Sequence, residues 1–101
     1  MPFIRSIYSS STSSEVLLTW VQPTLDESGN SLTPASYSIE AGVYEGDVQY
    51  IQIVNSSGAT SYNVALFLPS GTWYCRVYAW SGANASGARS LPSSDVIKIV
   101  P

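Results

Sequence analysis

One stretch of the sequence decides the fold, and it reads Phe67-Leu68-Pro69-Ser70-Gly71-Thr72-Trp73-Tyr74-Cys75-Arg76-Val77-Tyr78-Ala79-Trp80. A Pro-Ser-Gly turn opens this stretch, and a run of alternating side chains follows it. Because side chains point to opposite faces of a β-strand in turn, the alternation predicts a strand with one buried face. The predicted inward set is Trp73, Cys75, Val77 and Ala79, and the outward set is Tyr74, Arg76, Tyr78 and Trp80.

Short alternating segments, separated by Gly, Pro, Ser and Asn, fill the rest of the chain, and no segment has sustained helical periodicity. The spacing of the turns is typical of a β-sandwich. The seven predicted strands are Phe3–Tyr8, Glu15–Gln22, Ala35–Gly42, Val48–Val54, Thr60–Leu66, Thr72–Trp80 and Ser94–Val100. The predicted connections are Ser9–Ser14, a long loop that opens at Asp26–Asn30, tight turns at Glu45–Asp47 and Asn55–Gly58, and Ser81–Ser90, which we expect to be a mobile loop.

The same alternation predicts the core. Its expected members are Leu18, Trp20, Tyr37, Ile39, Tyr62, Val64, Trp73, Cys75, Val77, Ile97 and Ile99. Leu66 is also expected to face inward, and Lys98 outward. We expect the single cysteine, Cys75, to be a small buried side chain, because free cysteine is among the most buried residue types. A reactive nucleophile at this position would need a neighbouring base, and the chain has no histidine.

The segments that carry a family resemblance are Val16-Leu17-Leu18-Thr19-Trp20-Val21-Gln22-Pro23, Ser36-Tyr37-Ser38-Ile39-Glu40, Thr60-Ser61-Tyr62-Asn63-Val64 and Phe67–Ala79. In order and spacing they resemble the second, third, fifth and sixth strands of fibronectin type III domains. The stretches Gly82–Ser90 and Ser94–Val100 resemble the last loop and strand of that family. The resemblance covers roughly Val16 to Val100. It implies one domain over residues 1–101, folded as a seven-strand antiparallel Greek-key β-sandwich.

One position departs from the family pattern. Trp73 stands where the family usually has a tyrosine whose hydroxyl caps a corner, and an indole N–H can donate a hydrogen bond but cannot copy that geometry. The alternative is that Tyr74 takes the corner role through a bulge, which would flip the inward set of this strand. We favour Trp73 inward. An immunoglobulin domain is less favoured, because the second strand has no cysteine to pair with Cys75.

Composition excludes several functional classes. The chain has 101 residues, which is the size of one domain, and 45% of them are hydrophobic. Charged residues are 11%, against about 25% in ordinary soluble domains, and the net charge is −3. The basic residues Arg5, Arg76, Arg89 and Lys98 are scattered, so we expect no binding to nucleic acid or to a membrane surface. No apolar run is long enough to span a bilayer, and Met1–Tyr8 lacks the apolar core of a secretory signal.

The sequence offers no recognisable catalytic or cofactor site. Without histidine there is no catalytic triad, no Cys-His pair and no histidine-based metal site. The carboxylate pairs Asp26 with Glu27 and Glu45 with Asp47 lie in predicted turns, where such acids are usually solvated. We therefore expect a protein that is not an enzyme and needs no cofactor or metal.

The outward aromatics suggest an interaction surface at Tyr74, Arg76, Tyr78 and Trp80. In the fibronectin type III arrangement the sixth strand lies beside the third and the seventh, so the outer neighbours of these residues would be Ser36, Ser38, Glu40, Val96, Lys98 and Val100. Exposed Tyr and Trp side chains are enriched at protein interfaces, although they also pair across strands within a sheet. We expect a structural or adhesive module of an extracellular, cell-surface or virion (phage-like) protein that binds a protein partner or a second copy. The alternative is an accessory carbohydrate-binding module of a secreted polysaccharide hydrolase.

The loops give a weaker recognition signal. Gln22–Pro34 and Ser81–Ser90 should lie at the same end of the sandwich, and their candidate residues are Asp26, Glu27, Asn84 and Arg89. Asn55 and Asn84 each fit the N-glycosylation pattern, which chance also produces in a serine-rich chain. A subunit that assembles into a fibre or shell and a fragment of a multidomain protein fit the sequence equally well.

Overall fold

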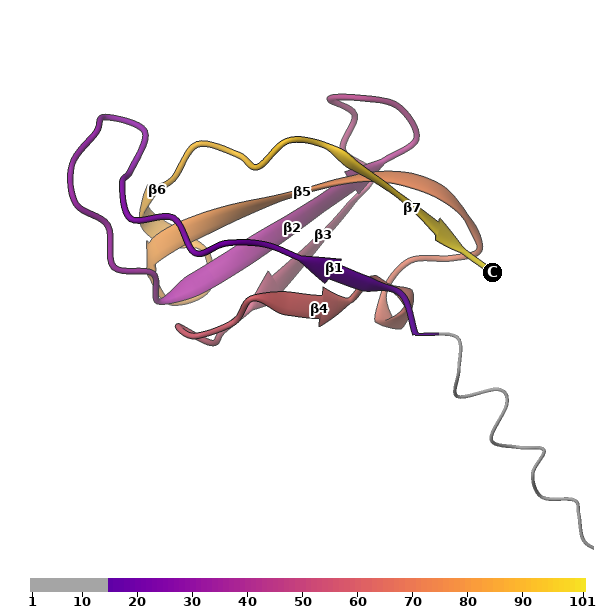
Figure 1. Ribbon diagram of the computed structural model, residues 1–101, viewed down its shortest axis with the longest axis horizontal. Helices are drawn as coiled ribbons and strands as arrows, with labels where there is room; N and C mark the ends of the chain where they lie inside the picture. The colour runs from indigo at the N-terminus through magenta and orange to yellow at the C-terminus, as the bar shows by residue number, and fades with distance from the viewer. Residues whose placement is uncertain (1–14) are drawn as a thin grey trace, which may run out of the picture.

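The computed structural model describes residues 15–101, and these form an all-β fold (Figure 1). The predicted strand Phe3–Tyr8 and the Ser9–Ser14 connection lie outside the described residues. The strands are β1 (Leu17–Thr19), β2 (Ser36–Gly42), β3 (Tyr50–Val54), β4 (Ser61–Asn63), β5 (Gly71–Gly82), β6 (Ser86–Arg89) and β7 (Val96–Val100), and a short 3-10 helix η1 (Val64–Leu66) follows β4.

All strand pairs are antiparallel and fall into two sheets. β1 pairs with β4, and a five-stranded sheet has the order β3-β2-β5, with β6 and β7 both paired to the other edge of β5. Because β5 is 12 residues long, it has room for both partners. In Figure 1 the small sheet lies in front of β2, β3 and β5. This two-layer arrangement is compatible with a β-sandwich.

The core lies between the two sheets. The predictions for Leu18, Tyr37, Ile39, Val64, Trp73, Cys75 and Val77 are confirmed, since each of these side chains is buried. Trp20 and Tyr62 are only partly buried, and both pack against this cluster. Leu32, Ala41, Leu68, Ala79 and Val100 complete the core.

The predicted orientation of the last strand is wrong. Ile97 and Ile99 are 54% and 68% exposed, whereas Val100 is buried. The register pairs Trp73 with Lys98, so Lys98 shares the inner face with Trp73, and the two isoleucines lie on the outer face. The predicted outer positions of Val96, Lys98 and Val100 are therefore also wrong. A shift of one residue in the expected alternation moves every side chain of a strand to the other face.

The fifth predicted strand ends earlier than expected. β4 stops at Asn63, whose side-chain Oδ1 accepts hydrogen bonds from the backbone N–H groups of Ala65 at 3.1 Å and Val16 at 2.9 Å. Asn63 thus caps η1, because a short polar side chain at this position can bind the first free N–H groups of a helical turn. The chain turns there, and Leu66, which was expected to face inward, is exposed.

The stretch Ser81–Ser90 is a hairpin rather than the predicted loop. β5 continues to Gly82 and β6 begins at Ser86. The turn between them places Asn84 and Ala85 at positive φ, 58° and 55°. The hydroxyl of Ser36 fixes this turn, since it donates to the carbonyl of Gly82 at 2.6 Å and accepts from the N–H of Ala85 at 3.0 Å.

Trp73 faces inward, as predicted, and the alternative with Tyr74 inward is wrong. The ring of Trp73 meets the ring of Tyr50 edge to face, with centroids 5.2 Å apart. This contact joins β5 to the edge strand β3 across the inner face of β2 and so holds the sheet together at the end where β5 begins.

Candidate functional site

The predicted interaction residues do lie on the outer face of β5, opposite the core. The β2–β5 register pairs Ser36 with Trp80, Ser38 with Tyr78 and Glu40 with Arg76, and these three β2 neighbours are the predicted ones. Ile97 of β7 pairs with Tyr74 at the other end of the strand. The structure places Arg76, Tyr78 and Trp80 in different environments.

Arg76 is engaged within the fold. Its Nη2 lies 2.9 Å from Oε1 of Glu40, and its Nη1 lies 3.6 Å from Oδ1 of Asp95. The loop between β2 and β3 closes this cluster, because the N–H of Gly46 donates to Asp95 at 3.2 Å. Burial lowers the pKa of the guanidinium and is the largest single effect, but the contributions of Glu40 and Tyr78 together outweigh it, and the net pKa of Arg76 is raised. Arg76 therefore stabilises the sheet and is not available to a partner on the surface. Its second partner, Asp95, was not predicted from the sequence.

Tyr78 is covered by Arg89. The side chain of Tyr78 is only 8% exposed, and the guanidinium carbon of Arg89 lies 4.4 Å above its ring centroid. The same guanidinium is 5.6 Å from the ring of Trp80, which is partly exposed and whose indole N–H donates to the hydroxyl of Ser38 at 2.8 Å. A cation above an aromatic face is a stabilising contact. Trp80 and Arg89, rather than Tyr78, are the members of this stack that a partner can reach.

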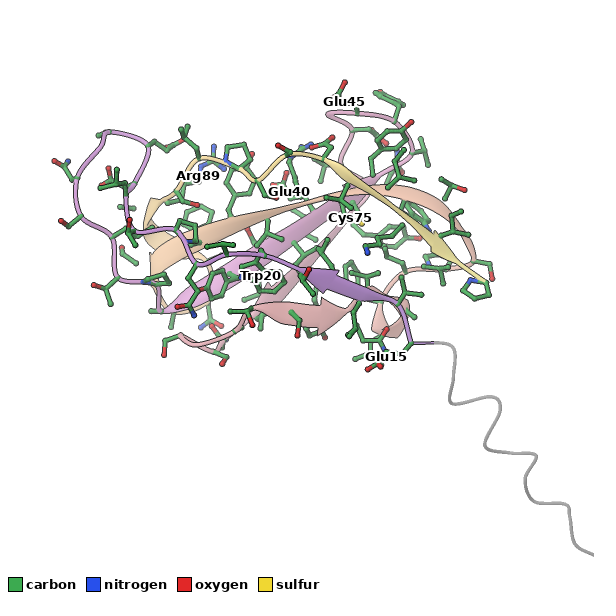
Figure 2. All side chains as sticks on the ribbon, in the orientation of Figure 1. Glu15, Trp20, Glu40, Glu45, Cys75 and Arg89 are labelled. Carbon is green, nitrogen blue, oxygen red and sulfur yellow. The ribbon has the colours of Figure 1, made fainter. Side chains whose placement is uncertain are left out.

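The two predicted recognition loops meet beside this stack. The backbone N–H of Glu27, in the loop between β1 and β2 (residues 20–35), donates to the carbonyl of Arg89 at 2.9 Å. The side chains of the same two residues form an ion pair at 3.4 Å. Asp26 shapes the loop, because its Oδ1 accepts from the N–H groups of Ser28 and Asn30, both at 2.9 Å. Figure 2 places Arg89 at this end of the molecule, far from Glu45.

These contacts build a groove of about 280 Å³, here called the Trp80 groove. It is lined by Asp26, Glu27, Ser28, Trp80, Gly87, Ala88 and Arg89. Three of the four weak loop candidates and one strand candidate thus come together: Asp26, Glu27, Arg89 and Trp80. The groove offers an indole, a guanidinium and two carboxylates, which can bind a polar or charged ligand.

Asn84 does not belong to the groove. Its Oδ1 accepts from the side chain of Asn55 at 2.6 Å, and its backbone N–H donates to the side chain of Asn55 at 2.8 Å. This pair ties the β5–β6 turn to the turn after β3. The asparagines of both glycosylation patterns are therefore bound to each other, and we assign Asn84 a structural role.

An apolar surface continues from the Trp80 groove and was missed in the sequence. A second hollow of about 370 Å³ shares Asp26 and Glu27 with the groove and adds Pro23, Leu25 and Leu91. A third hollow of about 180 Å³ extends this surface to Trp20, Val21 and Pro92. Val21, Leu25 and Leu91 are all exposed, and we call them the apolar rim. Isolated apolar residues in loops carry no periodicity, so only their proximity in the fold reveals them.

Within residues 15–101 no group of three or more His, Cys, Asp or Glu side chains is placed to hold a metal ion. The thiol of Cys75 is buried, and burial raises its pKa above the ordinary value. No helix within these residues is long and apolar enough to cross a membrane.

Comparisons with protein-family models, with curated proteins and with solved structures found no match. The loop end, where the Trp80 groove and the apolar rim adjoin, is therefore the candidate functional site.

Proposed function

We propose that this protein is a non-enzymatic structural or adhesive module of an extracellular, cell-surface or virion protein, and that it binds a protein partner at its loop end. The observation that carries the proposal is the continuity of the Trp80 groove with the apolar rim. One surface thereby combines an indole, a guanidinium and exposed leucines. Protein interfaces are enriched in Trp and Arg anchors set among apolar contacts.

The anchors are held in place before a partner arrives. Arg89 is positioned by the ion pair with Glu27 and by the ring of Tyr78, and Trp80 is positioned by its hydrogen bond to Ser38. Side chains fixed in this way lose less conformational entropy on binding, which favours affinity. The low content of charged residues supports an extracellular or virion setting and reduces the repulsion between associating molecules.

The proposal includes a fibronectin type III-like fold with seven strands in Greek-key order. What supports it is the neighbourhood of β5, which pairs with β2 on one side and β7 on the other, as the sixth strand of that family pairs with the third and the seventh. The separate pairing of β1 with β4 fits the same arrangement.

The test is affinity capture from the extracellular or virion fraction of the source, read by mass spectrometry. A genuine partner is captured by the parent protein and lost with Trp80→Ser and with Leu91→Ser. The matched control is Leu66→Ser, which changes an equally exposed leucine in η1, away from the loop end. A captured protein that survives both loop-end changes, or that is also lost with the control, would contradict the proposed site.

A carbohydrate-binding module is the second candidate, favoured by the Trp80 groove alone. An aromatic ring beside carboxylates and a guanidinium can stack on a sugar and bond its hydroxyls. Pull-down on insoluble polysaccharides separates the two functions. Sugar binding should be lost with Trp80→Ser and retained with Leu91→Ser, because the apolar rim would have no role in it.

A further inference from the structure

The two edges of the five-stranded sheet have similar patterns but different charges. β3, at one edge, reads Tyr50-Ile51-Gln52-Ile53-Val54, and β7, at the other, reads Val96-Ile97-Lys98-Ile99-Val100. In both strands the registers place the two isoleucines on the outer face and the central polar residue on the inner face. Within residues 15–101, no strand pairs with the far side of β3.

In the part of the chain that the structure describes, the edge formed by β3 lacks the features that usually prevent pairing. Natural edge strands are commonly guarded by charged side chains, by proline or by a covering segment. Between Asp47 and Arg76 the sequence contains no Asp, Glu, Lys or Arg, and β3 itself has neither proline nor glycine. Ile51 and Ile53 are exposed on its outer face. An uncharged strand of this composition is a template for main-chain pairing with another chain.

β3 is also complementary to itself. When two copies pair antiparallel about a twofold axis at Gln52, Ile51 of each copy faces Ile53 of the other, and Tyr50 faces Val54. Directly opposite apolar side chains stabilise such a pair, and four isoleucines would gather on the outer face. Gln52 would face its own counterpart, and an amide can both donate and accept. Its present bond, to the carbonyl of Ile53 at 3.1 Å, is exposed and exchangeable.

The same antiparallel pairing of two copies is unfavourable at β7. A twofold axis at Lys98 would place two ammonium groups directly opposite each other, and like charges at such positions are destabilising. A lysine on the inner face of an edge strand is one of the devices that prevents edge pairing in natural sheets. The difference between Gln52 and Lys98 therefore leaves β3 as the edge that is open to a second copy.

We propose that this chain forms a twofold dimer in which β3 pairs antiparallel with β3 of a second copy, joining two five-stranded sheets into one. The inference stands apart from the loop-end site, because β3 and β6 lie at opposite edges of the sheet. A contact built on five-residue strands falls in the size range of small, transient interfaces, so the dimer is concentration-dependent. A closed twofold pair uses the same patch on both copies, which stops growth at two chains.

The test uses the full chain and two charge variants at one position, Gln52→Lys and Gln52→Glu. Mass is followed by light scattering and sedimentation up to about 1 mM, the range in which a weak interface is populated. Each variant alone places like charges opposite each other, so each should weaken dimerisation at least about tenfold. An equimolar mixture places Lys opposite Glu and should restore the dimer. Lys98→Arg is the control at the other edge: it keeps the charge that opposes pairing of β7 and should leave the mass of the parent protein unchanged.

The possible outcomes separate clearly. A parent protein that stays monomeric over the whole range overturns the proposal, as does a mixture no heavier than its separate components. Assemblies larger than two chains that Gln52→Glu strengthens would mean that β3 of one copy pairs with β7 of the next, with residue 52 near Lys98. That result would also overturn the proposal. Circular dichroism and thermal melts establish that each variant is folded. We expect both variants to fold, because Gln52 is partly exposed on an edge strand.

Discussion

The rings of Trp20 and Tyr37 lie 5.3 Å apart at an angle of 48°. This contact joins the end of β1 to the centre of the large sheet, since Tyr37 is fully buried in β2. Figure 2 shows Trp20 just beyond β1. The indole Nε1 of Trp20 is buried and finds no hydrogen-bond partner among the described residues, so the ring contributes through apolar packing.

Replacing Trp20 with alanine should cost about 3 kcal/mol of unfolding free energy, at the lower end of the range for aromatic-to-alanine changes, because the ring is only partly buried. The thermal midpoint should fall by more than about 10 °C. Val21→Ala is the matched control, since the adjacent Val21 side chain is 90% exposed, and it should change stability by less than about 0.5 kcal/mol. A midpoint for Trp20→Ala within about two degrees of the parent would contradict the role of the ring.

Trp73 provides a hydrogen bond that Trp20 lacks. Its indole N–H donates to the carbonyl of Pro69, four residues upstream, at 2.9 Å, and so ties the turn before β5 to the strand. Trp73→Phe leaves that carbonyl without its partner and should cost about 1–2 kcal/mol more than Trp20→Phe, which removes an unpartnered indole. Urea unfolding of both variants measures the difference. Equal losses would show that the bond to Pro69 adds nothing.

The sequence predicted strand faces well where the two faces differ in character. In β5 the alternation of apolar residues with tyrosine and arginine favours one face as the inner one, and Trp73, Cys75 and Val77 are buried as expected. In β7 apolar residues lie on both faces: isoleucines occupy one face, and valines share the other with Lys98. Only pairing with β5 decides which set is inside, and that information is not local.

The candidate site was predictable in part for a similar reason. The sandwich topology expected from the sequence placed the two loops at one end, so Asp26, Glu27 and Arg89 could be proposed together. The rim residues Leu25 and Leu91 could not, since a lone leucine in a loop has no pattern to distinguish it. Arg76 was assigned to the surface because its partners Glu40 and Asp95 come from distant parts of the chain.

The Cys75 thiol should be unreactive in the native protein and should titrate late. Burial raises the pKa of the Cys75 thiol above 9.0 in the folded protein, so the thiol ionises at a lower pH in the unfolded chain than in the folded one. The stability that the neutral buried thiol contributes is therefore present below about pH 9 and is lost as the pH rises through the pKa of the folded state. We expect Ellman's reagent to react only after unfolding in urea. In Cys75→Ala the decline of stability between about pH 8 and 10 should be shallower. An equal decline in parent and variant would exclude the thiol as its source.

The ion pair of Arg76 with Glu40 should contribute more than that of Arg89 with Glu27. The side chains of the first pair are only 12% and 16% exposed, whereas those of the second are 37% and 50% exposed. Water screens the exposed pair, and measured values for such pairs are usually below about 1 kcal/mol. Double-mutant cycles with Arg→Met and Glu→Gln at each pair measure the coupling directly. We expect about 1–3 kcal/mol for the Arg76 pair and less than about 0.5 kcal/mol for the Arg89 pair.

The reverse order would mean that the Arg89–Glu27 pair is shielded from water and that Arg76 is effectively solvated. That result would remove the physical reason for assigning Arg76 to the sheet and Arg89 to the partner surface. Asp95→Asn provides an independent check, because it removes a charge 3.6 Å from Arg76 and changes nothing at the loop end. If Arg76, Glu40 and Asp95 act as one cluster, Asp95→Asn should lower the coupling energy between Arg76 and Glu40. An unchanged coupling energy would mean that the Arg76–Glu40 pair acts alone.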